Sequence, residues 1–86
     1  MTYQIEISKP AAKFIRSLPK PEKERVMRAI YKLPEEGDIK QMKGARGRGL
    51  FRLRVGDYRI IYSVDNGELI VFVIDAGNRG QIYNRY

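Results

Sequence analysis

The alternation of apolar and polar residues predicts a β-hairpin around which the rest of the chain is arranged. Residues 50–64, LFRLRVGDYRIIYSV, read as two strands joined by a two-residue turn at 56–57, and the glycine that begins this turn is typical of hairpins. Opposed residues share a face. One face is therefore apolar: Phe51, Leu53, Val55, Tyr58, Ile60 and Tyr62. The other face carries three arginines: Arg52, Arg54 and Arg59.

The segment before this hairpin reads as a strand and two helices. Residues 3–7 alternate between apolar and polar and predict a short strand. Ser8 follows as a candidate N-cap. Two runs with helical apolar spacing come next, and we expect them to end near Pro19 and Pro34. Their apolar stripes should pack on the sheet: Ala11, Phe14, Ile15 and Leu18, then Val26, Met27, Ile30 and Leu33.

The remaining segments complete the predicted fold. Residues 34–49 read as a polar loop, and residues 65–68 as a second tight turn. Residues 69–74 are apolar on both faces and predict a central strand. Residues 75–78 predict that the chain turns away from the sheet after this strand. A short tail, 77–86, could fold back over the arginines. We therefore expect one α+β domain, residues 1–86, with an N-terminal strand and a two-helix hairpin packed on a mainly antiparallel four-stranded sheet.

Composition adds a strong positive charge to this fold. The chain has 17 Lys and Arg against 10 Asp and Glu, a formal net charge of +7. A small basic domain usually meets nucleic acid, an anionic membrane or an acidic protein. The chain has no cysteine, and no signal peptide or apolar run long enough to span a bilayer is visible. We expect a soluble, cytoplasmic protein without a membrane contact.

The hairpin arginines suggest an anion site. Arg54 lies opposite Arg59 in the predicted register, and like charges so placed cost a sheet about 0.2–1 kcal/mol. A solvated outer face would explain one such arginine, whereas three that converge favour a site for phosphate, which guanidinium groups bind in a bidentate fork. The loop at 34–49 is either a basic flap beside this site or a solvated connection. The predicted RNA-binding residues are Lys40, Lys43, Arg46, Arg48 and, in the tail, Arg85.

The run MKG…GLFRLRVGDYRIIY, followed by an apolar strand, a G-x-R and a late I-Y, resembles the RelE-type toxins of the RelE/ParE toxin–antitoxin superfamily over nearly the whole chain. RelE-type toxins are similar to microbial ribonucleases and cut mRNA in the ribosomal A site, and an antitoxin neutralises them. ParE-type toxins share the fold and inhibit DNA gyrase. The resemblance implies an endoribonuclease that needs no metal or cofactor. It also implies the ribosome, its mRNA and rRNA, and a RelB-like antitoxin with an acidic amphipathic helix as partners.

Carried over to this sequence, the catalytic positions of the family are Arg52, Arg54, Arg59, Arg79 and Tyr83. In the family, the 2′-hydroxyl of one nucleotide attacks the adjacent phosphate. Arg59 and Arg79 would hold the phosphate oxygens, and Tyr83 would stack on a base or help in proton transfer.

The chain departs from the family at two of these positions. Well-studied relatives carry lysine where this chain has Arg52 and Arg54, and arginine is a poor general base. There is also no histidine. The general base for cleavage could be Lys43 or Tyr83. Alternatively, the cleavage rate could depend on electrostatic stabilisation alone, and cleavage would then be weak. A gyrase inhibitor and a nucleic-acid-binding module without catalysis remain the alternative functions.

Overall fold

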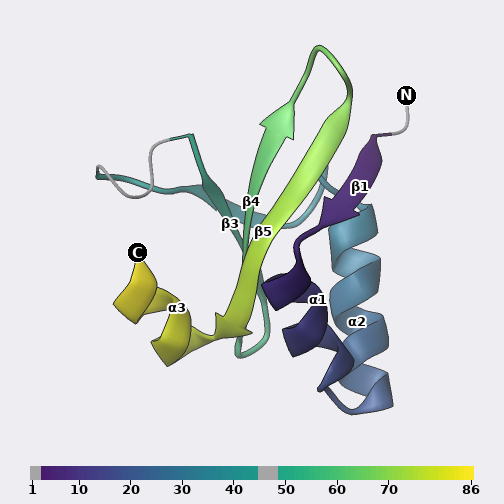
Figure 1. Ribbon diagram of the computed structural model, residues 1–86, viewed down its shortest axis with the longest axis vertical. Helices are drawn as coiled ribbons and strands as arrows, with labels where there is room; N and C mark the ends of the chain where they lie inside the picture. Colours follow the sequence, from purple (N-terminus) through teal and green to yellow (C-terminus); the bar gives the residue numbers. More distant parts are fainter. Residues whose placement is uncertain (1–2, 45–48) are drawn as a thin grey trace.

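The computed structural model describes residues 3–44 and 49–86, except for the side chain of Tyr83. Its five strands form one sheet in the order β1-β5-β4-β3-β2, with helices on both faces (Figure 1). The elements are β1 (Gln4–Ile7), α1 (Lys9–Arg16), α2 (Lys20–Tyr31), β2 (Asp38–Gln41), β3 (Phe51–Val55), β4 (Tyr58–Asp65), β5 (Ile70–Asn78) and α3 (Arg79–Arg85). The predicted α+β class is confirmed. Only the pairing of β1 with β5 is parallel.

Helices α1 and α2 form the two-helix hairpin expected from their apolar spacing. Ser8 caps α1, because its Oγ accepts a hydrogen bond from the Ala11 N–H at 3.2 Å. The apolar stripes of both helices are buried against Leu53, Ile60 and other residues of the predicted apolar face. Burial of one such side chain contributes about 1.5–3 kcal/mol, so this contact is the main source of stability.

The register of the β3–β4 hairpin is confirmed in full. Val55 pairs with Tyr58 and Arg54 with Arg59, and the two-residue turn lies between them. Gly56 has a φ of 58°. This left-handed conformation is the one that a two-residue hairpin turn requires at its first position and that glycine adopts without strain.

The prediction of four strands was wrong, because residues 38–41 form β2 within the segment expected to be a loop. Ile39 of β2 lies opposite Leu53 of β3 and packs against the core. A strand of four residues with one apolar side chain is too short for its alternation to stand out from a polar loop. The predicted flap residues Arg46 and Arg48 lie outside the described residues.

Two boundaries after the hairpin also differ from the prediction. Asp65 pairs with Ile70, so residues 66–69 form a four-residue connection instead of a tight two-residue turn. Strand β5 continues to Asn78 where the turn-like sequence DAGN predicted its end. Within this longer pairing of β4 with β5, the register shifts by one residue between Ile61, which pairs with Asp75, and Tyr62, which pairs with Val73.

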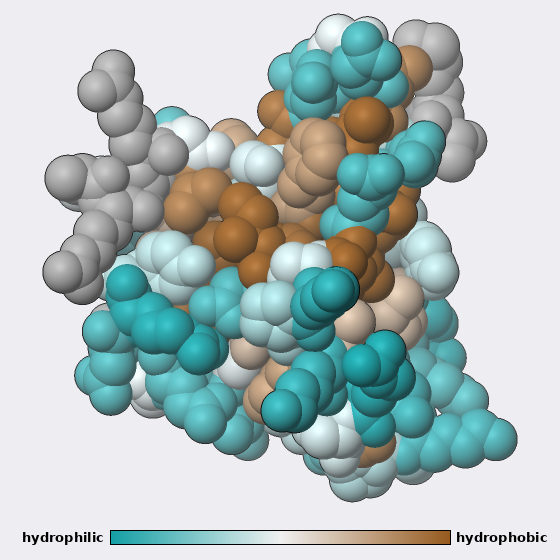
Figure 2. All heavy atoms as spheres, viewed as in Figure 1, coloured by the Kyte–Doolittle hydropathy of each residue, from teal (hydrophilic) through white to brown (hydrophobic). Residues whose placement is uncertain are grey.

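The C-terminal segment folds into α3 and returns across the sheet as expected. Asn78 precedes α3, and its N–H donates to Gln81 Oε1 at 3.1 Å. Ile82 of α3 and Ile61 of β4 are 1% and 0% exposed, yet neither belongs to the main core. They are therefore buried on the face opposite α1 and α2. Apolar surface stays open in the middle of the face shown in Figure 2.

None of the described helices has both the length and the apolar character needed to cross a membrane.

Tyr62 gives the fold a specific sensitivity to alkaline pH. Burial raises the pKa of Tyr62 to about 12 from its usual value near 10. The unfolded chain thus loses this proton first, so the stabilisation is present below pH ~10 and is lost as pH rises toward ~12. We expect Tyr62→Phe to keep its unfolding free energy at neutral pH and to lose less of it near pH ~11 than the wild type does, as measured by urea titration. Tyr31→Phe, at an exposed tyrosine, is the control. Equal alkaline losses in both variants would contradict the assignment to Tyr62.

Candidate functional site

The candidate site is the sheet face opposite α1 and α2, called here the arginine face, which carries Arg52, Arg54 and Arg59. These side chains lie on one face because β3 and β4 pair in the predicted register. The new strand β2 adds two residues, since Asp38 lies opposite Arg54 and Lys40 opposite Arg52. At these paired positions, three adjacent strands thus bring four basic residues and Asp38 to this face.

Asp38 forms ion pairs with Arg54 and Arg52, two neighbouring arginines of β3. Its Oδ2 lies 2.7 Å from Arg54 Nε, and its Oδ1 lies 3.5 Å from Arg52 NH2. The carboxylate offsets the repulsion between neighbouring guanidinium groups. Its side chain is half exposed, however, and exposed ion pairs contribute only about 0–1 kcal/mol. Sequence reasoning missed Asp38 because it assigned residues 34–49 to a loop.

Arg59 is only 4% exposed and helps to hold the hairpin turn. Its NH1 donates to the carbonyl oxygens of Gly56 and Tyr58, each at 3.0 Å. The Nε atoms of Arg59 and Arg52 are buried without a hydrogen-bond partner among the described residues. Buried donors of this kind are rare in folded proteins and carry a cost of about 1–3 kcal/mol each.

Arg79 begins α3 beside the same turn. Its backbone N–H donates to the carbonyl oxygen of Asp57 at 3.0 Å, and Gly77, two residues earlier, pairs with Arg59. The backbone of Arg79 is thus held at the end of the arginine face that carries Arg59. Tyr83 lies one turn further along α3, and its side chain is outside the described part of the structure.

The predicted RNA-binding residues do not all lie together. Lys40 joins the arginine face through β2, and Lys43 is exposed just beyond that strand. Arg85 of α3 forms an ion pair with Asp75, with 3.1 Å between Nε and Oδ2. Asp75 is 9% exposed, and its Oδ2 also accepts a longer hydrogen bond of 3.4 Å from Tyr86.

The sequence analysis did not predict the contacts of Asp75 with Arg85 and Tyr86. The position of Asp75 directly after the apolar run 69–74 was a signal that its carboxylate would be buried and would need partners. Burial, followed by the nearby charge of Asp75, raises the pKa of the Tyr86 hydroxyl.

The arginine face is suited to binding oxyanions. Arginine side chains donate several hydrogen bonds in a fixed plane and keep their charge, so they stabilise negative charge on a phosphate and its transition state. Among the described residues, no group of three or more His, Cys, Asp or Glu side chains is placed to hold a metal ion.

A family model matches most of the chain. The model describes the ParE toxin of the type II toxin–antitoxin system parDE, and it covers residues 5–83. No curated protein sequence matches the chain.

Solved toxin structures have the same fold. The archaeal RelE–RelB complex from Pyrococcus horikoshii OT3 contains a chain that is 32% identical, with a TM-score of 0.72 over 94% of this chain and 99% of that one. The RelBE2 toxin–antitoxin complex from Mycobacterium tuberculosis matches at 20% identity with a TM-score of 0.77, covering 92% of this chain and 100% of that one. The RelB–RelE complex from Methanococcus jannaschii matches at 24% identity with a TM-score of 0.72, covering 94% of this chain and 98% of that one. At these lower identities the last two similarities concern the fold alone. The chain therefore belongs to the RelE/ParE superfamily of type II toxin–antitoxin toxins.

Proposed function

We propose that this toxin is a ribosome-dependent, metal-independent endoribonuclease that cuts mRNA in the A site and acts in the cytoplasm. The observation that carries the proposal is the gathering of Arg52, Arg54 and Arg59 on one sheet face, with the backbone of Arg79 held at its end. The similarity at 32% identity to a chain of an archaeal RelE–RelB complex supports the same assignment.

The proposed reaction is an internal phosphoryl transfer. The 2′-oxygen forms a bond to the adjacent phosphorus while the bond from phosphorus to the 5′-oxygen breaks. The products are a 2′,3′-cyclic phosphate and a free 5′-hydroxyl. One proton leaves the 2′-hydroxyl and another reaches the departing 5′-oxygen.

In this scheme Arg59 and Arg79 hold the phosphate oxygens. Among the described residues, the Nε atoms of Arg59 and Arg52 lack an acceptor, which an anionic oxygen would supply once the groups that cover these atoms move apart. Arginine remains protonated, so these residues stabilise charge and do not accept the 2′-hydroxyl proton. Tyr83 and Lys43 are the candidates for that step, and we expect weak cleavage if neither performs it.

Asp38 competes with an RNA phosphate for Arg52 and Arg54. Asp38→Asn leaves the strand pairing in place but removes the carboxylate charge that the two guanidinium groups share. We expect this variant to bind a short, fluorescein-labelled RNA with 2′-O-methyl groups about 3–10-fold more tightly at low salt, as measured by anisotropy. Glu68→Gln, which removes an equal charge in the β4–β5 connection, is the control. Unchanged affinity in Asp38→Asn would mean that Asp38 does not limit access to these arginines.

We also propose an acidic antitoxin as the partner of this chain. Two of the solved structures with this fold are complexes of RelE with RelB, from Pyrococcus horikoshii OT3 and Methanococcus jannaschii. The net charge of +7 would attract an acidic helix. The half-buried apolar residues of β5, including Phe72 and Ile74, would contact the apolar side of that helix. Co-purification of the toxin with the product of a neighbouring small reading frame at moderate salt is the test.

The second candidate is a ParE-like inhibitor of DNA gyrase, which the matching family model favours. Primer extension on ribosome-bound mRNA with the purified wild-type protein separates the two functions. The nuclease should produce new 5′ ends within translated codons and none on the same mRNA without a start codon, and it should leave gyrase supercoiling unaffected. Inhibition of supercoiling without new 5′ ends would overturn the nuclease proposal. Binding of RNA with neither effect would indicate a nucleic-acid-binding module.

A further inference from the structure

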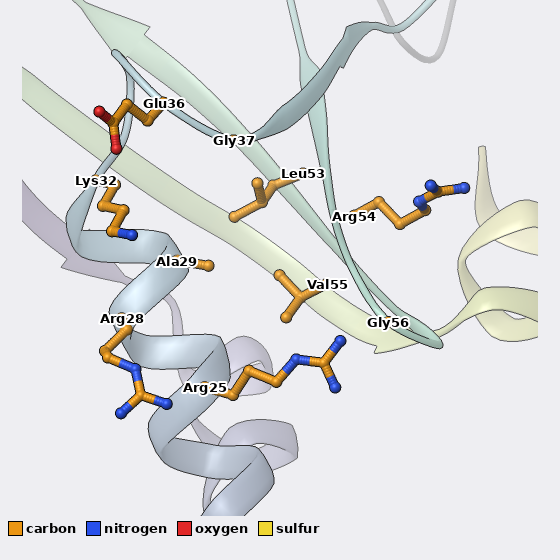
Figure 3. Close-up of a pocket in the computed structure, with 10 residues that line it drawn as sticks. All are labelled: Arg25, Arg28, Ala29, Lys32, Glu36, Gly37, Leu53, Arg54, Val55 and Gly56. Carbon is orange, nitrogen blue, oxygen red and sulfur yellow. The ribbon is translucent and has the colours of Figure 1, made fainter.

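A second basic surface lies at the edge of the helix layer, next to the arginine face. It is a groove between α2 and β3 with a volume of about 380 Å³. Its lining includes Arg25 and Arg28 of α2, Lys32 at the end of that helix, and Arg54 of β3. Figure 3 shows the Arg25 side chain reaching from α2 toward Gly56, whereas the Arg54 side chain points away from α2. The groove defined by these four residues and Gly56 is called here the α2 groove.

The cations of α2 lie on one side of the helix because three and then four residues separate them. Arg25, Arg28 and Lys32 are exposed, and none of them forms an ion pair or a side-chain hydrogen bond with another described residue. Like charges at this spacing destabilise a helix by about 0.2–0.5 kcal/mol per pair. The acid one turn before Arg25, Glu22, instead accepts a hydrogen bond from the Tyr58 hydroxyl at 2.6 Å. None of these three cations is therefore held in an ion pair with a described acid, whereas Arg54 is paired with Asp38.

Gly56 leaves room for the guanidinium group of Arg25 beside the hairpin turn. A Cβ at residue 56 would lie 2.8 Å from Arg25 NH2 and 3.2 Å from NH1, so the guanidinium group lies against the turn only because glycine is there. The carbonyl of the same glycine accepts the hydrogen bond from Arg59. The turn thus holds Arg59 by a hydrogen bond and lies against the guanidinium group of Arg25. Arg54, which lies on the arginine face, also lines the groove, so the two surfaces are continuous.

The lining of the groove favours nucleic acid over protein as its ligand. Its two large apolar residues, Leu53 and Val55, are 1% and 7% exposed, so little apolar surface is open to anchor a partner side chain. The groove instead offers the cationic groups of three α2 residues against one acid, Glu36. Arginine and lysine side chains arranged in this way bind backbone phosphates without reading sequence.

We propose that the α2 groove binds RNA phosphates, as a contact additional to the phosphate that is cut. This inference rests on the proposed function, which brings the toxin to ribosomal RNA and mRNA. The phosphates could belong to either RNA. A strand on the arginine face could continue past the hairpin turn into the groove, or the groove could contact the ribosome while mRNA occupies the arginine face.

The test compares two triple variants with the same loss of charge. Arg25→Gln/Arg28→Gln/Lys32→Gln removes the groove cations, and Lys9→Gln/Arg16→Gln/Lys20→Gln removes three exposed cations elsewhere on α1 and α2. Both are checked for folding by circular dichroism. Binding is measured across a salt series to the 2′-O-methyl RNA, which cannot be cut, and to ribosomes. The groove variant should bind at least about 10-fold more weakly at low salt, and the slope of log K against log salt should shrink by about 2.

The two ligands identify the source of the phosphates. Weaker binding to both the short RNA and ribosomes indicates an extension of the mRNA path, and weaker binding to ribosomes alone indicates ribosomal RNA. A folded groove variant with the affinity and salt slope of the control would overturn the proposal. So would unchanged RNA binding combined with loss of an acidic antitoxin partner, which would make the groove a protein-binding surface. Because binding is measured without cleavage, a wild-type protein that binds RNA through the groove but cuts no mRNA would contradict only the nuclease.

Discussion

Arg79→Ala is expected to slow the cleavage of ribosome-bound mRNA by about 10²–10³-fold, the usual effect of removing one group that stabilises the transition state. The backbone N–H of residue 79 would still donate to the Asp57 carbonyl, so the start of α3 should stay beside the hairpin turn. The variant therefore removes a charged side chain and keeps the backbone hydrogen bond at the start of the helix. Time courses of primer extension with purified protein measure the rate.

Arg16→Ala is the matched control, since Arg16 is an exposed arginine at the end of α1, in the helix layer on the other side of the sheet. It should cleave like the wild type. Full cleavage by a folded Arg79→Ala variant would remove Arg79 from the proposed mechanism. Arg59→Ala is a less specific test, because it would also leave the carbonyls of Gly56 and Tyr58 without the hydrogen bonds that Arg59 donates.

The hairpin could be predicted from the sequence because its determinants are local. A glycine at the first turn position and regular alternation on both sides fix the register, and with it the face shared by Arg52, Arg54 and Arg59. The resemblance of this segment to a known family then extended the prediction to Arg79, whose backbone lies beside the turn.

The parts that were not predicted depend on contacts between distant segments. Strand β2 has one apolar residue, Ile39, and becomes recognisable only when that side chain lies opposite Leu53. The sequence DAGN favours a turn, yet its four residues pair with residues 58–61 of β4, and this pairing extends β5 through them. The ion pairs of Asp38 were not predicted because the strand that carries Asp38 was not predicted.

The burial of Arg59 could not be read from periodicity either, because its cross-strand neighbour is Gly77 and α3 packs over that glycine. Only the folded chain shows that this arginine also holds the hairpin turn.

Helix α3 depends on its contact with the sheet. Seven residues are too few for a stable isolated helix in water, so packing must hold the helix in place. Ile82 supplies the buried side chain, and its Cδ1 would lie 3.4 Å from a Cβ at Gly77, which locates it directly over β5. Because Ile82 lies outside the main core, its loss should affect α3 without unfolding the domain.

Ile82→Ala is therefore expected to release α3 and, with it, the site. Deleting a buried isoleucine side chain costs about 2–5 kcal/mol, which is more than the ion pair between half-exposed Arg85 and Asp75 contributes to holding this helix. Amide hydrogen exchange of residues 79–86 should rise strongly while exchange in β3, β4 and β5 stays slow. Cleavage should fall about as far as in Arg79→Ala, because Arg79 and Tyr83 are both carried by α3. Asn84→Ala, at an exposed position of the same helix, should keep both protection and activity. Retained protection and full cleavage in Ile82→Ala would show that α3 does not need this anchor to position the two residues.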